Sequence, residues 1–439
     1  MRAPALLFAA SALLFAPSTV WAQNLAPDQF DVVPDEEPRA GTSALQPTDW
    51  LTLSGELRER ATLISDVNFD PDQEDNGWFW TQRLSVTSDV EATPWLRGRL
   101  TLLSALTEGG PEGPIERNDL GVQEGYIDIG PTDAFLRVGR QEFVLGSYRL
   151  VANREGTNVR RTWDGVRASF ARNDWQFDTF ALQEVLVEPE GVFNDDSDDS
   201  RRLAGVYATG PAPIGSIDLY YLYAEFEDKE TIETVADEER HSIGVRSFGE
   251  IGQAFWNWEA IYQFGEQGEF DISAWTVAAN TGYRFSNLPW SPEFLFSTNI
   301  ASGDDEQGDG TLGTFNALFP RGSYFSELAQ FGPSNFYNVH PYIKAHPRED
   351  ILIFVDVNFL WRLEEADGIY GPPGNIIRRG GTTDAHFVNT SVSAGIEWEA
   401  TEHLFFSTLY TRAEAGQFIE DTGPSASIDF VEFTARVRF

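Results

Sequence analysis

Apolar and polar residues alternate with a period of two over long parts of this 439-residue chain. The alternation is clearest over residues 351–363, where the odd-numbered positions are apolar and polar residues such as Asp356 lie between them. Residues 428–439 repeat the pattern and end on an aromatic residue, Phe439. Strand side chains point to opposite faces in turn, whereas a helix would scatter these apolar residues around its axis. Both runs therefore predict β-strands with one apolar and one polar face.

Eighteen strand candidates of this kind follow residue 50. They start near residues 51, 78, 95, 121, 134, 163, 175, 203, 216, 241, 254, 273, 292, 335, 351, 389, 403 and 428. An even number of antiparallel strands returns the end of a closed sheet to the side on which it began. The mean hydropathy of −0.30, with 13% aromatic residues, fits a wall in which every second residue contacts lipid. The predicted fold is all-β, a transmembrane antiparallel β-barrel of about 18 strands over residues 51–439.

The connections between these candidates alternate in length. After even-numbered candidates they are short and rich in turn-forming residues, as at 130–133 and 210–215. After odd-numbered candidates they are long, and the longest covers residues 302–334. Short turns on one side and long loops on the other are typical of bacterial outer-membrane barrels, whereas a soluble propeller has no reason to alternate in this way. We therefore expect the long loops outside the cell and both termini in the periplasm.

The N-terminal region predicts export from the cytoplasm. Residues 1–22 contain one Arg, an apolar run and a small-residue ending at Ala22, which is the layout of a cleaved signal peptide. Residues 23–50 are acidic and show no period, so we expect a flexible periplasmic leader without a fold. No later apolar stretch reaches the roughly 20 residues of a membrane helix. Because the chain contains no Cys, a closed sheet rather than disulfides must hold the exported protein together.

Charge is distributed unevenly along the chain. The net charge of −38 argues against nucleic acid as a partner, and most of the acidic residues lie in the long connections. Residues 142–162 depart from this rule, because two acids stand against four arginines there, a net charge of +2. These residues are Glu142, Glu155, Arg149, Arg154, Arg160 and Arg161. This exception is the best indication of function in the sequence.

A motif surrounds the same region. Residues 153–167 read NREGTNVRRTWDGVR, and Gly139-Arg140-Gln141-Glu142 precedes them. This set resembles the alginate-export family of outer-membrane porins, closely over about residues 137–170 and in architecture over about residues 50–439. The resemblance implies an eighteen-stranded barrel with an arginine-lined constriction for an anionic polysaccharide, without catalysis or a bound cofactor. The positions that match the motif are Arg140, Arg154, Arg160, Arg161, Asp164 and Arg167.

The sequence departs from the family at one place. The exporter that it resembles has a long periplasmic loop near the end of the barrel that can occlude the pore, whereas residues 399–402 here predict a tight turn. Gated export through a secretion machine is therefore not expected. Passage would be diffusive, and the direction of a passive pore cannot be read from its residues.

The chemistry of arginine supports the same hypothesis independently. Arginine supplies 29 of the 31 basic residues, and its planar guanidinium presents a fork of donors that matches a carboxylate. Arginines in a low-dielectric pore would concentrate acidic solutes. By alternation Arg83, Arg137 and Arg362 also face the lumen, so we add them to the predicted constriction. The alternative is structural, because about half of the lumenal arginines would pair with wall acids such as Glu124 and Asp128.

No metal or cofactor site is expected. The acidic segments 194–199 and 303–310 offer oxygen ligands but complete no EF-hand pattern, so we expect solvated surface or loose divalent bridging to lipopolysaccharide. His340 and His346 would lie about 20 Å apart along one strand, too far to share an ion.

Three alternatives to a polysaccharide channel remain. One is a general or anion-selective uptake porin for small acidic solutes. Another is an outer-membrane hydrolase, for which His386, Asn389 and Ser391 form the one grouping we find, although ordinary strand residues explain them better. The last is a receptor or adhesin, which the lack of a plug domain weakens. Expected partners are an anionic polysaccharide or oligo-uronate, outer-membrane lipid and lipopolysaccharide, and the barrel-assembly machinery, which the terminal Phe439 suggests. We expect a monomer.

Overall fold

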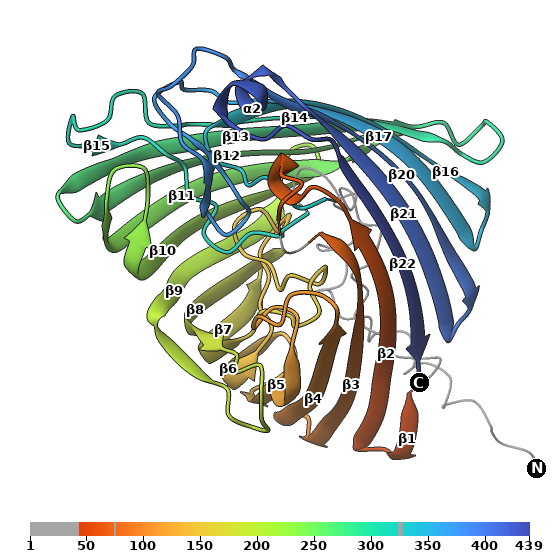
Figure 1. Ribbon diagram of the computed structural model, residues 1–439. Coiled ribbons are helices and arrows are strands. Elements are labelled where there is room, and N and C mark those ends of the chain that lie inside the picture. Colours follow the sequence, from red (N-terminus) through yellow and green to blue (C-terminus); the bar gives the residue numbers. More distant parts are fainter. Residues whose placement is uncertain (1–43, 74–75, 324–327) are drawn as a thin grey trace, which may run out of the picture.

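A computed structural model describes residues 44–73, 76–323 and 328–439 of the chain, so the expected signal peptide and most of the leader lie outside the described residues. Eighteen strands form a closed antiparallel barrel (Figure 1). The barrel closes because its first strand, β2, pairs with its last, β22. Among the described residues, no helix has the length and apolar character to cross a membrane.

The barrel strands, in chain order, are β2 (Leu51–Ile64), β3 (Gly77–Thr93), β4 (Leu96–Glu108), β5 (Asn118–Ile129), β6 (Ala134–Gln141), β7 (Trp163–Arg172), β8 (Trp175–Leu186), β9 (Asp196–Pro211), β10 (Ser216–Glu230), β11 (Val235–Ile251), β12 (Ala254–Gln267), β13 (Phe270–Arg284), β14 (Glu293–Ala301), β16 (Phe336–Arg348), β17 (Ile351–Trp361), β20 (Phe387–Thr401), β21 (Leu404–Ala415) and β22 (Ile428–Arg438). The smaller elements are β1 (Leu45–Thr48), η1 (Val67–Phe69), β15 (Thr311–Leu312), β18 (Ile369–Tyr370), β19 (Ile376–Arg378) and α2 (Gln417–Thr422).

The predicted strands are confirmed one by one, and most start within three residues of the expected position. The largest differences are at β9, which starts at Asp196 rather than near residue 203, and at β11, which starts at Val235 rather than near residue 241. Both strands begin in polar, acidic sequence. Where both faces of a strand are exposed to water, the alternation of apolar and polar residues disappears. The alternation therefore begins only several residues after the strand itself.

Alternation separates a lipid face from a lumenal face as predicted. In β17, Val355 is 51% exposed on the outer surface, whereas its neighbour Asp356 is 3% exposed on the inner side. The inner face is polar along most strands, and buried arginines lie on it. The wall therefore presents apolar side chains to the membrane and charged ones to the interior.

The two ends of the barrel differ in their connections. The turns that follow β3, β5, β7, β9, β11, β16 and β20 have two to four residues, and the longest loops, 142–162, 302–335 and 362–386, lie at the other end. The turn between β20 and β21 has two residues, which confirms the predicted tight turn. Two connections at the long-loop end are shorter than expected, 231–234 and 268–269, because β10 to β13 extend beyond the predicted bounds.

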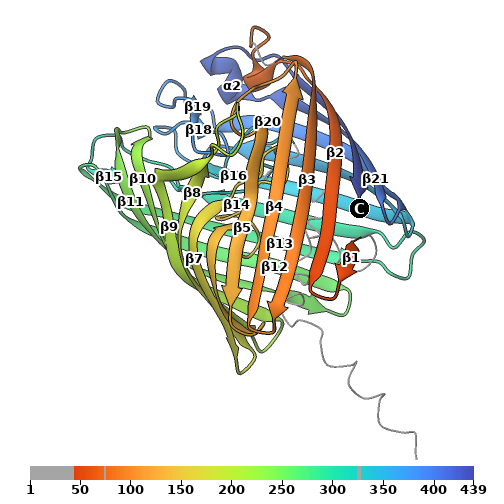
Figure 2. The ribbon, with the colours of Figure 1, turned by 90° about the horizontal axis from the view of Figure 1, so that it is seen from below.

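The chain enters the barrel at the start of β2 and leaves it at the end of β22, and both of these points lie at the short-turn end. Figures 1 and 2 show β1 and the C-terminus there, with α2 at the opposite end. The assignment of the short-turn end to the periplasm stays a prediction. Part of the expected leader is ordered, however, because residues 45–48 form β1 and pair with β2, Leu45 opposite Leu53.

The seam between β2 and β22 depends on Gly55. The backbones of Gly55 and Phe439 exchange hydrogen bonds of 2.7 and 2.9 Å. A Cβ atom at Gly55 would lie 2.5 Å from the Phe439 ring and 2.9 Å from the carbonyl oxygen of Ser85. The ring of the terminal Phe439 therefore occupies the space that a side chain at position 55 would need.

We expect Gly55→Val to weaken the closure of the barrel, because the valine side chain displaces the Phe439 ring and strains the strand. The temperature at which the folded, fast-migrating band disappears on gels should fall by several degrees. Gly113→Val is the matched control, because a Cβ atom there contacts nothing within 4 Å. Equal melting temperatures for both variants would contradict this role of the seam.

Candidate functional site

Residues 142–162, which connect β6 to β7, fold into the barrel, and we call them the strap. Near its start, Arg149 Nη1 lies 2.8 Å from Glu259 of β12. At its middle, Glu155 forms ion pairs with Arg83 of β3 and Arg58 of β2. Because β12 and β2 lie on opposite sides of the barrel in the strand order, the strap crosses the lumen.

A second loop, residues 302–335 between β14 and β16, supports the strap from the side. Val151 and Phe319 form a parallel β-bridge, in which Ala152 N donates to Phe319 O at 2.9 Å and Phe319 N donates to Leu150 O at 2.9 Å. The Phe319 ring also meets Trp163 edge-on, with 4.6 Å between centroids. Both rings are at most 1% exposed. The two loops thus share an apolar core inside the barrel, which fixes the position of the strap.

Glycine allows the strap to approach the wall. Gly146 has φ +54°, and a Cβ atom there would lie 2.5 Å from the hydroxyl of Tyr207 on β9. Only glycine combines this backbone conformation with so close a contact. The Tyr207 hydroxyl in turn donates to Asp218 at 2.6 Å, so the wall at this point is held by its own hydrogen bonds.

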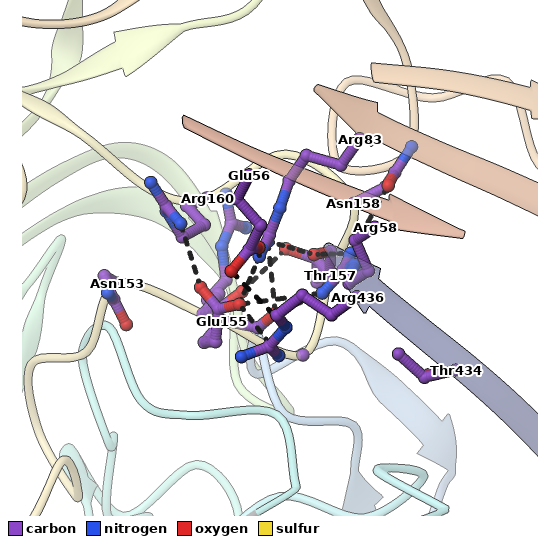
Figure 3. A network of polar contacts seen from close by, with 12 residues as sticks. Glu56, Arg58, Arg83, Asn153, Glu155, Thr157, Asn158, Arg160, Thr434 and Arg436 are labelled. Carbon is purple, nitrogen blue, oxygen red and sulfur yellow. Dashed lines mark hydrogen bonds and ion pairs between the residues drawn. The ribbon is translucent and has the colours of Figure 1, made fainter. Parts of the chain in front are cut away.

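Four arginines surround the carboxylate of Glu155, and we call them the cradle (Figure 3). The closest contact is to Arg83, and the other nitrogen–oxygen distances are 3.2, 3.7 and 3.8 Å. The cradle consists of Arg58 of β2, Arg83 of β3, Arg160 of the strap and Arg436 of β22. A single carboxylate therefore joins the strap to three wall strands.

The ion-pair network around the cradle carries more positive than negative charge. Through ion pairs, five arginines share three carboxylates, which gives the network a net charge of +2. Its members are Arg58, Arg83, Arg160, Arg436, Arg438, Glu56, Glu142 and Glu155. Part of the excess is satisfied by dipoles, because Arg58 donates to the carbonyl oxygens of Glu155 at 2.9 Å and Thr157 at 2.8 Å.

Glu155 stays ionised in this environment. Burial alone would raise the pKa of Glu155, but Arg83, Arg160 and Arg58 more than offset burial and hold the pKa well below its usual range. The stability that this carboxylate adds is therefore present above the ordinary glutamate pKa and is lost only as the pH falls through the lowered one. The strap should remain attached across mildly acidic conditions.

Arg154 differs from the other strap arginines. It forms no ion pair within the described part of the chain, and its Nε atom donates no hydrogen bond there. Its backbone is left-handed, with φ +59°. Burial, followed by the charge of Arg161, lowers the pKa of Arg154 to about 9, so the guanidinium is still protonated at neutral pH.

Towards the short-turn end of the lumen lies a row of four partly exposed arginines on β4, β6 and β7, which we call the arginine row. Their side chains are 16% to 24% exposed, and each pairs with a wall acid. The row consists of Arg97, Arg99, Arg137 and Arg167. The paired acids are Asp89, Glu124, Asp128 and Asp178. Unlike Arg58, Arg83 and Arg436 of the cradle, all four arginines of the row contact water.

Two predicted pore residues, Arg140 and Asp164, lie outside the lumen. They pair with each other at 2.8 and 2.9 Å across β6 and β7, and they share a face with Val138 and Val166, which are more than 40% exposed on the outer surface. Their neighbour Trp163 points inward. This placement corrects the expectation that they line the constriction. Counting alternate positions along β6 from the inward-facing Arg137 would have placed Arg140 on the outer face, whereas the motif alone did not.

Arg362 also has a different role from the one expected. Its guanidinium donates to the carbonyl oxygens of Ala385 and Glu365 at 2.7 Å each and also to that of Thr383, and it lies over the ring of Phe418. The side chain is fully buried. Arg362 therefore holds the loop 362–386 in place rather than presenting charge to a solute.

Arg362→Ala should release this loop, because several carbonyl groups lose a charged donor, at a local cost of about 3 kcal/mol. Limited proteolysis should then cut within residues 362–386, while ion selectivity is unchanged. The matched control is Arg379→Ala on the same loop. Arg379 and its partner Glu230 are both about 60% exposed, and such surface pairs contribute little. A protease pattern that matches wild type for Arg362→Ala would rule out the clamp.

Three other predicted pore residues form ion pairs. Arg83 and Arg160 belong to the cradle, and Arg161 is bound to Glu184 at 2.7 Å. Sequence reasoning missed the roles of Arg436 and Glu155, and the one signal for Glu155 was that it is an isolated acid among arginines. The scarcity of acids in the strap did not leave Arg149 and Arg161 unpaired, because Glu259 of β12 and Glu184 of β8 supply their carboxylates.

The candidate hydrolase residues do not assemble. The ring nitrogens of His386 lie 3.0 Å from Arg362 O and 3.1 Å from Glu365 Oε1, so they face neither Ser391 nor Asn389. Within the three described stretches, no three His, Asp or Glu side chains come together in a way that could hold a metal ion.

Comparisons with known structures agree with this geometry. OccK2 of Pseudomonas aeruginosa superposes with a TM-score of 0.61 at 12% identity, covering 91% of this chain and 99% of that one. OccK3 of the same organism gives 0.61 at 9% identity, covering 89% and 95%. OccAB2 of Acinetobacter baumannii gives 0.58 at 11% identity, covering 88% and 98%. Among curated proteins, none matches the chain.

The fold is therefore the β-barrel of the outer-membrane porins. The model of the alginate export family matches residues 49–432, and the chain belongs to this family. The family and the structural neighbours are channels and not enzymes, and the protein is placed in the bacterial outer membrane.

Proposed function

We propose that the barrel passes an anionic oligo- or polysaccharide of the alginate type, and that the strap and the arginines beside it form the selective part of the path. The observation that carries this proposal is the excess of guanidinium at the strap, where five arginines share three carboxylates and Arg154 has no ion pair with any described residue.

Physical chemistry connects this excess to uronates. A guanidinium stays charged at any working pH and binds a carboxylate through two parallel hydrogen bonds. Inside a barrel the surrounding wall lowers the dielectric constant, so an uncompensated charge acts more strongly on a passing anion than it would in water. A polyuronate carries one carboxylate per sugar, so it could contact the strap and the arginine row in succession.

The close alternative is an uptake porin for small acidic solutes. The strap crosses the lumen, and a constricted lumen would suit small solutes better than a polymer. The neighbour OccK2 has been crystallised in complex with glucuronate, which is a single acidic sugar. Both functions need the same arginines, so the size of the solute distinguishes them.

The orientation and processing of the chain belong to the same proposal. Residues 1–22 would be cleaved on export, residues 23–44 would precede the barrel in the periplasm, and the short turns would face the periplasm. The acidic long loops would then face the outside of the cell, next to lipopolysaccharide.

The test is passage as a function of oligomer length. Mature protein in liposomes is supplied with oligo-uronates of increasing length and with neutral oligosaccharides of equal length. The proposal predicts faster uptake of the acidic series, including oligomers too long for a small-solute porin. Passage of mono- and disaccharides alone would favour the uptake porin. Equal rates for the acidic and neutral series would refute anion recognition altogether.

A further inference from the structure

The cradle has features of a binding site that is already occupied. Three of its arginines, Arg58, Arg83 and Arg436, are at most 3% exposed. Burying so many like charges is costly unless an anion lies among them. The anion is the side chain of Glu155, which belongs to a loop and not to the wall.

Glu155 does not satisfy all the donors around it. Arg436 reaches carboxylates only at 3.4 and 3.8 Å, and its Nε and Nη2 atoms donate no hydrogen bond within the described residues. These two atoms form one edge of the guanidinium fork, the geometry that a free carboxylate binds with two hydrogen bonds. A carboxylate with fewer constraints than Glu155 would bind this edge better.

The cradle also has an accessible side. Arg160, Glu56 and Arg438 border it, and their side chains are 17% to 18% exposed. Arg160 lies on the strap itself, so it moves with Glu155. A solute that reaches Arg160 would therefore meet both the cradle and the part of the strap that blocks it.

From these contacts we infer that the cradle is a carboxylate-binding site for the solute, which Glu155 occupies when solute is absent. A uronate carboxylate and the Glu155 carboxylate would compete for the same guanidinium groups, and binding of the uronate would release the Glu155 side chain from β2, β3 and β22 and loosen the middle of the strap. No covalent change is involved. The inference rests on the proposed passage of anionic sugars, and it adds that the strap is displaced by the solute it selects.

The first test is the block of single-channel current by glucuronate in planar bilayers. Glu155→Gln keeps the shape of the side chain but removes the competing charge, so half-maximal block should need about tenfold less glucuronate. Glu432→Gln is the matched control: it removes one lumenal charge on β22, but Glu432 pairs with Arg60 outside the cradle. Block by glucuronate should change little in that variant, and glucose should block none of them.

A second test follows the strap directly, because the protein has no cysteine. Val159 lies on the strap and is 1% exposed against Leu103 and Ala105. A thiol in Val159→Cys should react slowly with a water-soluble reagent, faster when glucuronate is added, and fast without glucuronate once Glu155→Gln is introduced. Retained heat-modifiable mobility on gels shows that each variant is folded.

The outcomes separate the two proposals. If glucuronate blocks wild type and Glu155→Gln at the same concentration, and the thiol reacts at one rate throughout, then anion passage stands and the competition is refuted. If no variant shows anion preference or block, the proposed function itself fails. Tighter block together with faster thiol modification supports the displaced strap.

Discussion

Replacing residues 150–160 by a short Gly-Ser linker should raise single-channel conductance several-fold. These residues are the part of the strap that crosses from the β12 side to β2, β3 and β22, and conductance depends most on the narrowest cross-section of the path. Removal also deletes Glu155, so the wall arginines lose their anion and anion preference should increase. The measurement is conductance and reversal potential in planar bilayers.

Two controls accompany this variant. The barrel strands are outside the replaced segment, so heat-modifiable gel mobility and β-sheet content should be kept. Glu155→Gln alone loosens the strap without deleting it, so it should raise conductance less than the replacement does. A linker variant with wild-type conductance would show that the strap is not the narrowest point of the path.

Replacing all four members of the arginine row by Gln should reverse the ion selectivity. The substitution removes the guanidinium partners of Asp89, Glu124, Asp128 and Asp178, and the negative charge left on the lumenal face would then attract cations. The arginine side chains of the row contact water, so the loss of their ion pairs costs less stability than a change to the buried arginines of the cradle. The reversal potential under a salt gradient should change sign.

Arg140→Gln is the matched control for this experiment. Arg140 is paired with an acid just as the row arginines are, but it lies on the outer face of β6. It should leave the reversal potential unchanged. If Arg140→Gln shifted selectivity as strongly as the row substitutions, long-range charge rather than the lumenal position would control permeation.

Much of the barrel could be predicted from the sequence because strand periodicity is local. Each residue of β17 shows its face through its immediate neighbours, and the two-residue turn between β20 and β21 is equally local. Because the number of strands is even, the first strand must begin and the last strand must end on the same side of the barrel. The short strand β1 escaped because four residues are too few to show a period.

The strap could not be predicted, because its partners are far away in the sequence. Glu155 lies 97 residues from Arg58 and 72 from Arg83, and no local pattern shows that a long loop turns inward. The unusual positive charge of residues 142–162 identified the correct segment but not its fold. The motif match also carried over Arg140 and Asp164, for which the alternation of β6 and β7 gives the better answer.

Arg362 illustrates a different limit. Alternation places it on the inner side correctly, but its guanidinium donates hydrogen bonds to the backbone carbonyl groups of residues 365, 383 and 385. An inward position therefore does not establish contact with solute. Whether a lumenal arginine is available depends on loops whose conformation the sequence does not reveal.

The most direct test of the account is the reversal potential of the wild-type channel under a salt gradient, measured before and after adding an oligo-uronate. The account predicts the sign of anion preference, despite the chain's net charge of −38, and a loss of current when the oligo-uronate enters. A cation-selective channel whose current ignores the oligo-uronate would contradict it.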